Sequence, residues 1–264
     1  MSVQEEQIVT GEKIRYVRLH GGALWRVALD APKGNVLDAA MTAELTGLFR
    51  AAANEPKLKA VLLTGEGSNF SFGASVEEHR AEQVKDFLGR FHGLFRAIAE
   101  SRIPVFAAVR GVCLGGGLEL VAFCQRIFAH PESSFGQPEI KLGVFAPVGA
   151  AILAERVGRG AADDLLLTGR SVKADEAFAM RLVDEITDTP EATALSWIEK
   201  HLMPRSASSL RFAAHSARMA FLRRFERDIE QLESMYLEEL MATRDANEGI
   251  AAFIEKREPT WSDA

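Results

Sequence analysis

The sequence lacks a disulfide framework, because it contains only two cysteines, Cys113 and Cys124, and no CxxC pair that would suggest a metal site. A chain of this length buries enough surface to fold without covalent cross-links. We therefore interpret both cysteines as buried thiols in a reducing compartment. No apolar run approaches the ~18 residues that a membrane-spanning helix needs. The first residues, MSVQEEQIVTGEKIR, are polar and acidic, which is not typical of a secretory signal or a transit peptide. The sequence predicts a cytoplasmic protein.

A basic surface is also missing, since 31 Lys and Arg stand against 37 Asp and Glu and give a net charge of −6. This charge argues against nucleic acid as a partner, which would require a strongly basic face. No metal site is predicted either, because no ligand spacing joins the six histidines, which are His20, His79, His92, His130, His201 and His215. What remains has the composition of an ordinary soluble enzyme, with 47% hydrophobic and 26% charged residues.

Buried strands alternate with helical patterns through residue 130, which predicts an α/β fold built from βα units. The predicted strands span residues 14–20, 24–29, 58–64, 103–109 and 127–129, and Gly21-Gly22 indicates a hairpin between the first two. One helical pattern begins after Asp38, and a second, separate helical pattern covers residues 83–100.

Only helices are predicted beyond residue 150, including a long helix over residues 206–241 and a last one over 246–256. This helix-only tail is interpreted as a packing or assembly module. An apolar stripe in the long helix fits packing either within the chain or between subunits, and its members are Leu232, Met235, Tyr236 and Leu240.

A triple glycine after a buried strand, in GVCLGGGLEL (residues 111–120), is the first candidate for chemistry. Glycines let the backbone approach a ligand closely, and the first N–H groups of the following helix have no intrahelical partner. Such groups suit a developing oxyanion, and Glu119 lies in the first turn beside them. The segment does not fit the GxGxxG pattern of dinucleotide binding. A plain packing turn with a solvated Glu119 remains an alternative.

A second carboxylate, Glu139, lies in FGQPEIKLG (residues 135–143), after Pro138 and among apolar neighbours. Two carboxylates at one site can take different protonation states, so that one acts as an acid and the other as a base. The alternative is that one of the two is an exposed loop acid.

These segments, with FSFGAS (residues 70–75) before them, resemble the enoyl-CoA hydratase/isomerase (crotonase) family. The resemblance runs from APKGNVLD near residue 31 to AFIEKREPTW at the C-terminus. It implies an α/β crotonase-like ββα spiral core with the acyl-CoA site over residues 1–200. It further implies a C-terminal helical region over residues 201–264 that mediates trimerisation and completes the CoA site. The expected assembly is a homotrimer or a homohexamer made of two trimers.

The resemblance also implies roles for individual residues. The backbone N–H groups of Ala74 and Gly116 would form an oxyanion hole for the thioester oxygen. Glu119 would activate water and Glu139 would deliver a proton to carbon, a pair typical of hydratases in this family. No cofactor would be bound permanently, since coenzyme A arrives as part of the thioester substrate.

Coenzyme A is expected to contact the APKGNVL loop, mainly through its backbone. The residues that the resemblance assigns to substrate or CoA binding here are Lys33, Asn35, Gly115 and Lys256. Lys256 or its neighbour Arg257 would reach phosphate, possibly across a subunit interface. Solvated lysines are the alternative reading of Lys33 and Lys256.

The sequence departs from the family at Pro147, which has no N–H where a glycine N–H would help to hold the water. Phe72, Phe145 and Pro147 would line the acyl pocket with bulk, which favours a compact ring. NFSFGASVEEH and FGQPEIKLGVFAP are most similar to the cyclohexa-1,5-diene-1-carboxyl-CoA hydratases of anaerobic benzoyl-CoA degradation, which form 6-hydroxycyclohex-1-ene-1-carboxyl-CoA. Alternatives are hydration of cyclohex-1-ene-carboxyl-CoA or of a short linear enoyl-CoA, or a non-catalytic binding protein of the same fold.

Overall fold

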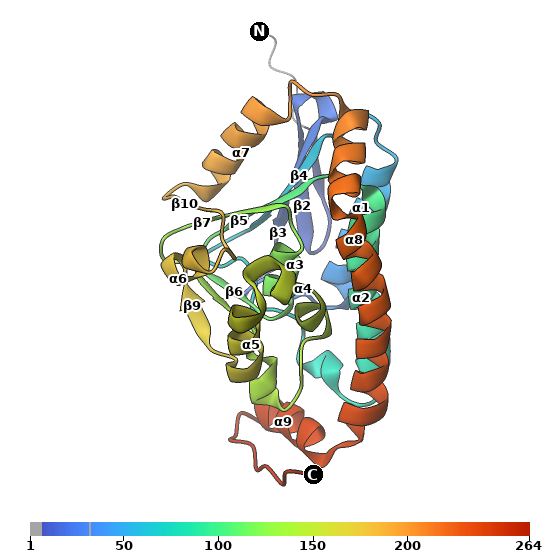
Figure 1. Cartoon of the computed structure of the whole chain (residues 1–264), viewed down its shortest axis with the longest axis vertical. Helices are drawn as coiled ribbons and strands as arrows, with labels where there is room; N and C mark the ends of the chain where they lie inside the picture. Colours follow the sequence, from blue (N-terminus) through green and yellow to red (C-terminus); the bar gives the residue numbers. More distant parts are fainter. Residues whose placement is uncertain (1–6, 32) are drawn as a thin grey trace.

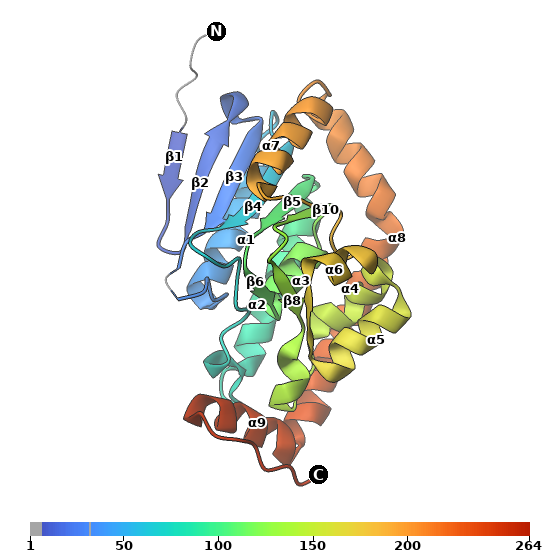
Figure 2. The same cartoon turned by 90° about the vertical axis from the view of Figure 1, so that its left-hand side faces the viewer.

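A large twisted sheet of strands in the order β1-β2-β3-β4-β5-β7-β10 forms the frame of the protein (Figures 1 and 2). The computed structural model describes residues 7–31 and 33–264, so residues 1–6 and Pro32 of the APKGNVL loop lie outside the described residues. β1, β2 and β3 pair antiparallel, and β3, β4, β5, β7 and β10 follow in parallel. The strands are β1 (Gln7–Thr10), β2 (Ile14–Leu19), β3 (Leu24–Leu29), β4 (Ala60–Gly65), β5 (Val105–Val109), β7 (Arg126–Ala129) and β10 (Glu185–Ile186).

Alternation of side chains along these strands gives the large sheet two buried faces. Val61 and Leu63 of β4 point into the main core, which α1 (Ala39–Ala53) and α2 (Val84–Ser101) cover. Leu62, between them, points to the other face, where α7 (Pro190–His201) packs with Ile198. Figures 1 and 2 show α7 on one side of the sheet and α1 and α2 on the other.

A small sheet of three short strands brings the two candidate segments together. Its strands are β6 (Val112–Leu114), β8 (Ser134–Gly136) and β9 (Ser171–Lys173). β6 leads into the triple glycine and pairs in parallel with β8, which leads into Gln137, Pro138 and Glu139. The N–H of Gly115 extends this pairing by donating to the carbonyl of Gly136 at 2.9 Å. Segments about twenty residues apart therefore leave the small sheet side by side.

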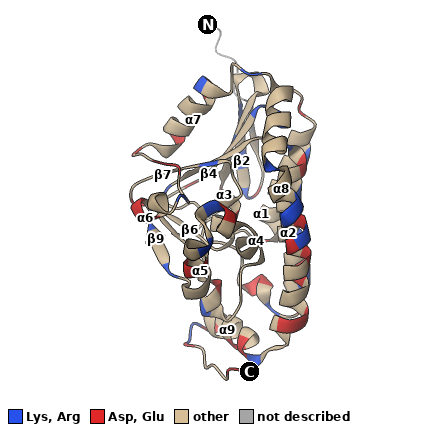
Figure 3. Cartoon of the chain, viewed as in Figure 1, with Lys and Arg blue, Asp and Glu red and all other residues tan. Residues whose placement is uncertain are grey.

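The remaining helices surround the two sheets. They are α3 (Gly116–Ala122), α4 (Pro147–Val157), α5 (Arg159–Thr168), α6 (Ala174–Ala179), α8 (Ala207–Ser234) and α9 (Arg244–Glu255), with 3-10 turns η1 (His20–Gly22), η2 (Glu77–His79) and η3 (Pro138–Leu142). α8 runs along one side of the molecule beside α2, and its Phe225 and Ile229 are buried in the main core (Figure 1). Lys, Arg, Asp and Glu are interspersed along the outside of α2 and α8 (Figure 3).

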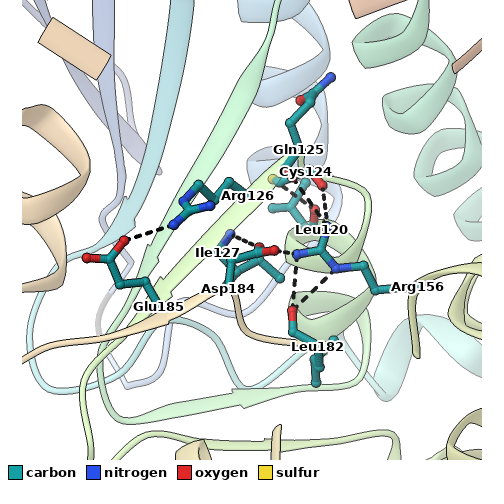
Figure 4. A network of polar contacts seen from close by, with 9 residues as sticks. All are labelled: Leu120, Cys124, Gln125, Arg126, Ile127, Arg156, Leu182, Asp184 and Glu185. Atoms are coloured by element: carbon teal, nitrogen blue, oxygen red, sulfur yellow. Dashed lines mark hydrogen bonds and ion pairs between the residues drawn. The ribbon is translucent and has the colours of Figure 1, made fainter. Parts of the chain in front are cut away.

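An arginine network fixes α4 to the edge of the large sheet (Figure 4). Arg156 donates to the carbonyls of Cys124 and Leu182 at 3.2 and 3.1 Å and pairs with the Asp184 carboxylate. Asp184 in turn accepts from the N–H of Ile127 on β7 at 2.8 Å. These bonds hold the C-terminal part of α4, so the N-terminal end of the same helix has a defined position.

The predicted α/β class is confirmed, and so are the strands and helices that were predicted through residue 130, whereas β1, β6 and β8 were not predicted. The prediction of a helix-only tail was wrong, because β9 and β10 lie within it. Strands of three and two residues are too short to show a period of their own, and sheet partners far away in the sequence define them. The regular α-helical part of the long helix ends earlier than predicted, at Ser234. A π turn (Met235–Glu239) and a 3-10 turn (Leu240–Ala242) follow it. In the described part of the chain, no helix combines the length and apolarity needed to span a membrane.

Candidate active site

Two backbone N–H groups, those of Ala74 and Gly116, lie next to each other at the start of α3. A Cβ built on Gly116 would lie 3.2 Å from the Ala74 nitrogen, and one on Gly73 would lie 3.3 Å from the Gly116 nitrogen. Gly116 is the first residue of α3, so its N–H has no acceptor within the helix. For the Ala74 N–H, no acceptor is found among residues 7–31 and 33–264. Two neighbouring free donors can hold one carbonyl oxygen between them.

The loop that carries Ala74 is held rigidly from within the protein. Ser71 donates through Oγ to the carbonyl of Asn35 at 2.8 Å and accepts from the N–H of Gly73 at 3.0 Å. Gly73 has a φ of +100°, which favours glycine. Buried Asn35 accepts from the N–H of Ala31 at 3.0 Å and donates to three carbonyls, those of Glu66, Asn69 and Phe70. The Asn35 side chain therefore organises the loop, and its predicted contact with a ligand stays a prediction.

Glu119, in the first turn of α3, is almost fully buried with 3% of its surface exposed. Its Oε1 accepts from the N–H of Gly149 at 2.6 Å, and the nearby N–H of Val148 also lowers the pKa of the carboxyl group. Both amides belong to the first turn of α4, where Pro147 has no N–H to offer. The carboxyl thus caps the positive end of an eleven-residue helix, an arrangement that stabilises its ionised form.

Glu139, at the start of η3, approaches the triple glycine from the other side. Its Oε1 would lie 2.8 Å from a Cβ on Gly115, so a side chain at position 115 would force this carboxyl group to shift. The same Oε1 accepts from Gln137 Nε2 at 3.0 Å. Its Oε2 is inaccessible to solvent and has no hydrogen-bond partner within the described part of the chain, although the residue as a whole is half-buried.

Burial raises the pKa of both carboxyl groups above the ordinary value of 4.5. Repulsion between the two negative charges raises the pKa of Glu119 further, while the N–H groups of Gly149 and Val148 lower it in part. The hydrogen bond from Gln137 acts in the same lowering direction on Glu139. Glu119 and Glu139 therefore lie within interaction range of each other, and removing the last proton from the pair is costly.

A cavity of about 420 Å³ lies at the APKGNVL loop and is lined, among others, by Asp30, Lys33, Asn35, Ser68, Asn69 and Phe72. Lys33 is exposed there, and the Phe72 ring packs over Gly34 with 48% of its surface accessible. Phe72 thus lies with the predicted CoA-binding residues Lys33 and Asn35. Lys256 ends α9 in a left-handed conformation and is not among the residues that line this cavity within one described chain.

Three residues that contact the carboxyl pair or its surroundings were missed by sequence reasoning. Gln137 lies inside the recognised FGQPEIKLG segment and could have been found there. The N–H of Gly149 carries no sequence signal, since its role depends on where α4 begins. Tyr236 was interpreted only as part of a packing stripe, yet it is fully buried and its ring packs against Phe145 at a centroid distance of 5.2 Å.

Comparisons with known proteins agree with this geometry. The family model described as enoyl-CoA hydratase/isomerase matches residues 20–264. A cyclohexa-1,5-dienecarbonyl-CoA hydratase from Thauera aromatica is 47% identical over 242 residues, which cover 92% of this chain and 94% of that protein. A short-chain-enoyl-CoA hydratase from Clostridium acetobutylicum is 32% identical and covers 88% of this chain and 91% of that protein. The crystal structure of an enoyl-CoA hydratase from Mycobacterium avium matches with a TM-score of 0.84 at 30% identity, covering 96% of this chain and 100% of that one.

The chain belongs to the enoyl-CoA hydratase/isomerase family. The predicted crotonase-type fold is confirmed by the solved structures that match it over nearly its whole length. The relatives also confirm the prediction of an enzyme of the hydratase type, a carbon–oxygen lyase.

The buried carboxyl pair should make the stability of the fold depend on pH. Because both pKa values are raised on folding, the folded chain holds more protons than the unfolded chain above pH 4.5, the ordinary glutamate value. The free energy of unfolding should therefore fall as pH rises from 4.5 toward neutrality, by up to about 1.4 kcal/mol per pH unit for each group. Glu119→Gln should flatten this slope in urea denaturation at pH 5 and pH 7.

The matched control is Glu132→Gln, which changes an exposed glutamate in the turn before β8 and should keep the wild-type slope. Equal slopes for the wild type and Glu119→Gln would contradict raised pKa values for the pair.

Proposed function

We propose that the chain adds water to cyclohexa-1,5-diene-1-carboxyl-CoA and forms 6-hydroxycyclohex-1-ene-1-carboxyl-CoA. The observation that carries the hydration chemistry is the pair of buried carboxyls, Glu119 and Glu139, beside the neighbouring N–H groups of Ala74 and Gly116. The choice of substrate is supported by the Thauera aromatica hydratase, whose name states this activity and whose sequence is 47% identical over 92% of the chain.

The two N–H groups bind the thioester oxygen. When the hydroxyl of water attacks the conjugated system, electrons move through the double bonds onto this oxygen and form an enolate. Ala74 and Gly116 donate hydrogen bonds to the growing negative charge without moving, because the Ser71 bonds hold one donor loop and α3 holds the other. Losing one such donor costs about 3–4 kcal/mol of transition-state stabilisation in other enzymes.

The two carboxyls divide the proton transfers. In the proposed mechanism Glu119 is the ionised member, because its Oε1 accepts a hydrogen bond from the N–H of Gly149 at 2.6 Å, and it accepts a proton from the water. Glu139 holds the proton and gives it to carbon at the other end of the diene as the enolate electrons return. The new hydroxyl group comes from the water, and the new hydrogen on carbon comes from Glu139. One proton remains on the pair, which returns to its starting state when that proton moves from Glu119 to Glu139.

Substrate contacts follow from the placement of the predicted residues. Phe145 and Pro147 lie in the chain between Glu139 and Gly149, whose N–H binds Glu119, and they are proposed to give the acyl pocket apolar surface that suits a compact ring. The cavity with Lys33, Asn35 and Phe72 is proposed to receive the coenzyme A moiety, and Gly115 leaves room beside Glu139. Lys256 is proposed to meet a CoA phosphate of a neighbouring subunit, since it does not line this cavity in its own chain.

Assembly into a trimer, or a hexamer of two trimers, in the cytoplasm is proposed through the helical region of residues 201–264, with residues 1–200 as the core. Support comes from exposed apolar side chains in this region, since Phe212, Phe253 and Trp261 are 69%, 53% and 44% accessible in the single chain. Light scattering on the purified protein measures the mass directly, and a monomer would contradict this assembly.

Replacing either carboxyl should stop turnover while binding of the thioester persists. Glu119→Gln and Glu139→Gln each remove one proton-transfer group at nearly constant volume, so kcat should fall about 10²–10⁴-fold. Binding of the CoA ester, measured by calorimetry, should change little, because the oxyanion donors and the CoA cavity are untouched. Glu132→Gln serves as the exposed control and should match the wild type. Wild-type rates in both site variants would contradict the mechanism. Binding of the CoA ester without turnover in the wild type would instead favour a non-catalytic binding protein.

The choice among substrates is tested by comparing three thioesters. Cyclohexa-1,5-diene-1-carboxyl-CoA, cyclohex-1-ene-carboxyl-CoA and a short linear enoyl-CoA are followed by loss of the absorbance of the conjugated thioester. The diene should have the highest kcat/KM by at least about tenfold, which corresponds to ~1.4 kcal/mol. A tenfold preference for the linear substrate would overturn the assignment of a cyclic acyl group.

A further inference from the structure

Tyr236 combines complete burial with an unused hydroxyl group. None of its surface is exposed, and its hydroxyl has no hydrogen-bond partner among the residues that the structure describes. Burying a hydroxyl without a partner costs about 1–3 kcal/mol, so such groups are rare in folded proteins. A phenylalanine would fill the same space without this cost. The hydroxyl therefore calls for an explanation other than packing.

The position of Tyr236 connects it to the carboxyl pair. Its ring packs on Phe145 at 5.2 Å, with 59° between the ring planes. Phe145 lies in the short segment between η3, which carries Glu139, and α4, whose Gly149 N–H binds Glu119. Burial and the negative charges of Glu139 and Glu119 raise the pKa of the phenol, so it keeps its proton and remains a hydrogen-bond donor.

The local backbone presents this side chain to the interior. Tyr236 lies in the π turn that follows α8, and such turns within helices occur frequently at functional sites. Its neighbour Met235 is 45% exposed, whereas Tyr236 is fully buried. One turn earlier, Glu233 bonds Nδ1 of buried His92 on α2 at 2.6 Å, which fixes the end of α8 against the core. The tyrosine is thus held in place from a second helix.

A reacting water needs a donor as well as acceptors. Buried waters typically make about three hydrogen bonds. A water that donates hydrogen bonds to the two carboxyl groups still needs a donor that orients it through its oxygen. Pro147, at the start of α4, has no N–H for this purpose. Near the pair, the Oε2 of Glu139 and the hydroxyl of Tyr236 are both buried without a partner among residues 7–31 and 33–264. One is a carboxyl oxygen and the other a donor, as a water between them requires.

We propose that Tyr236 is a further catalytic residue whose hydroxyl donates a hydrogen bond to the oxygen of the attacking water. After addition, this oxygen is the hydroxyl oxygen of the product, and the same donor contacts it in the reverse reaction. The phenol keeps its proton throughout, so the proton balance between Glu119 and Glu139 is unchanged. This assignment rests on the proposed hydratase function.

The test is Tyr236→Phe, which removes one oxygen and leaves the ring against Phe145. The sequence offers a matched control, because Tyr16 is the other of its two tyrosines and stacks on Trp25 within the β2–β3 hairpin, half-buried. Tyr236→Phe should lower kcat about 10- to 100-fold, the range for a hydrogen bond of roughly 1.5–3 kcal/mol, with KM changed less than about threefold. Its thermal midpoint should not fall, since the lost hydroxyl has no protein partner. Tyr16→Phe should keep the wild-type kcat.

Two results would overturn the assignment while leaving the hydratase function intact. One is a wild-type kcat in Tyr236→Phe alongside an active wild type and Tyr16→Phe. The other is a fall in kcat together with a lowered thermal midpoint, which would mean that the hydroxyl supports packing. If the wild type turns over none of the three thioesters, the proposed function is wrong, and the role assigned to Tyr236 is then wrong as well.

Discussion

The burial of two carboxyl groups within interaction range of each other is the constraint on which the rest of the site depends. Like charges in a poorly hydrated environment repel strongly, so the pair holds on to a proton that isolated glutamates would lose. The protein limits the cost by giving Glu119 two N–H groups of α4 and Glu139 the amide of Gln137. The proposed mechanism requires one ionised and one protonated group in this pair, so that they act as base and acid in one step.

The fold meets this constraint through short-range backbone geometry. The small sheet lets the triple glycine and the Glu139 segment leave in parallel, and Gly115 leaves space for the carboxyl that a side chain would block. The Arg156 network holds α4 in place (Figure 4). At the other end of this helix, the N–H of Gly149 meets Glu119. The π turn after α8 closes the arrangement, because its Tyr236 packs on Phe145. The groups proposed to be catalytic thus come from loops and helix ends, while the large sheet supplies the frame.

Much of this could be predicted from the sequence, and the failures have physical causes. Helices such as α2 have a strong apolar period, and Glu119 and Glu139 lie in recognisable segments, so both were found. β9 and β10 were missed because strands of two or three residues exist only through their partners. The hydrogen bond from the Gly149 N–H to Glu119 was not predicted, because it depends on where the fold places the first turn of α4. Asn35 was predicted to contact a ligand because its loop was recognised, and this stays a prediction. Its buried amide also bonds four backbone groups, a role that only tertiary contacts reveal.

The proposed division of acid and base requires that Glu119 and Glu139 together hold one proton at neutral pH. Infrared spectroscopy measures this directly, since a protonated carboxyl group has a carbonyl stretch that is separate from the bands of carboxylates. The wild type at pH 7 should show the band of one buried protonated carboxyl, and the Glu119→Gln/Glu139→Gln double variant should lack it. Identical spectra for the two proteins in this region would mean that both carboxyls are ionised, and the assignment of acid and base would be wrong.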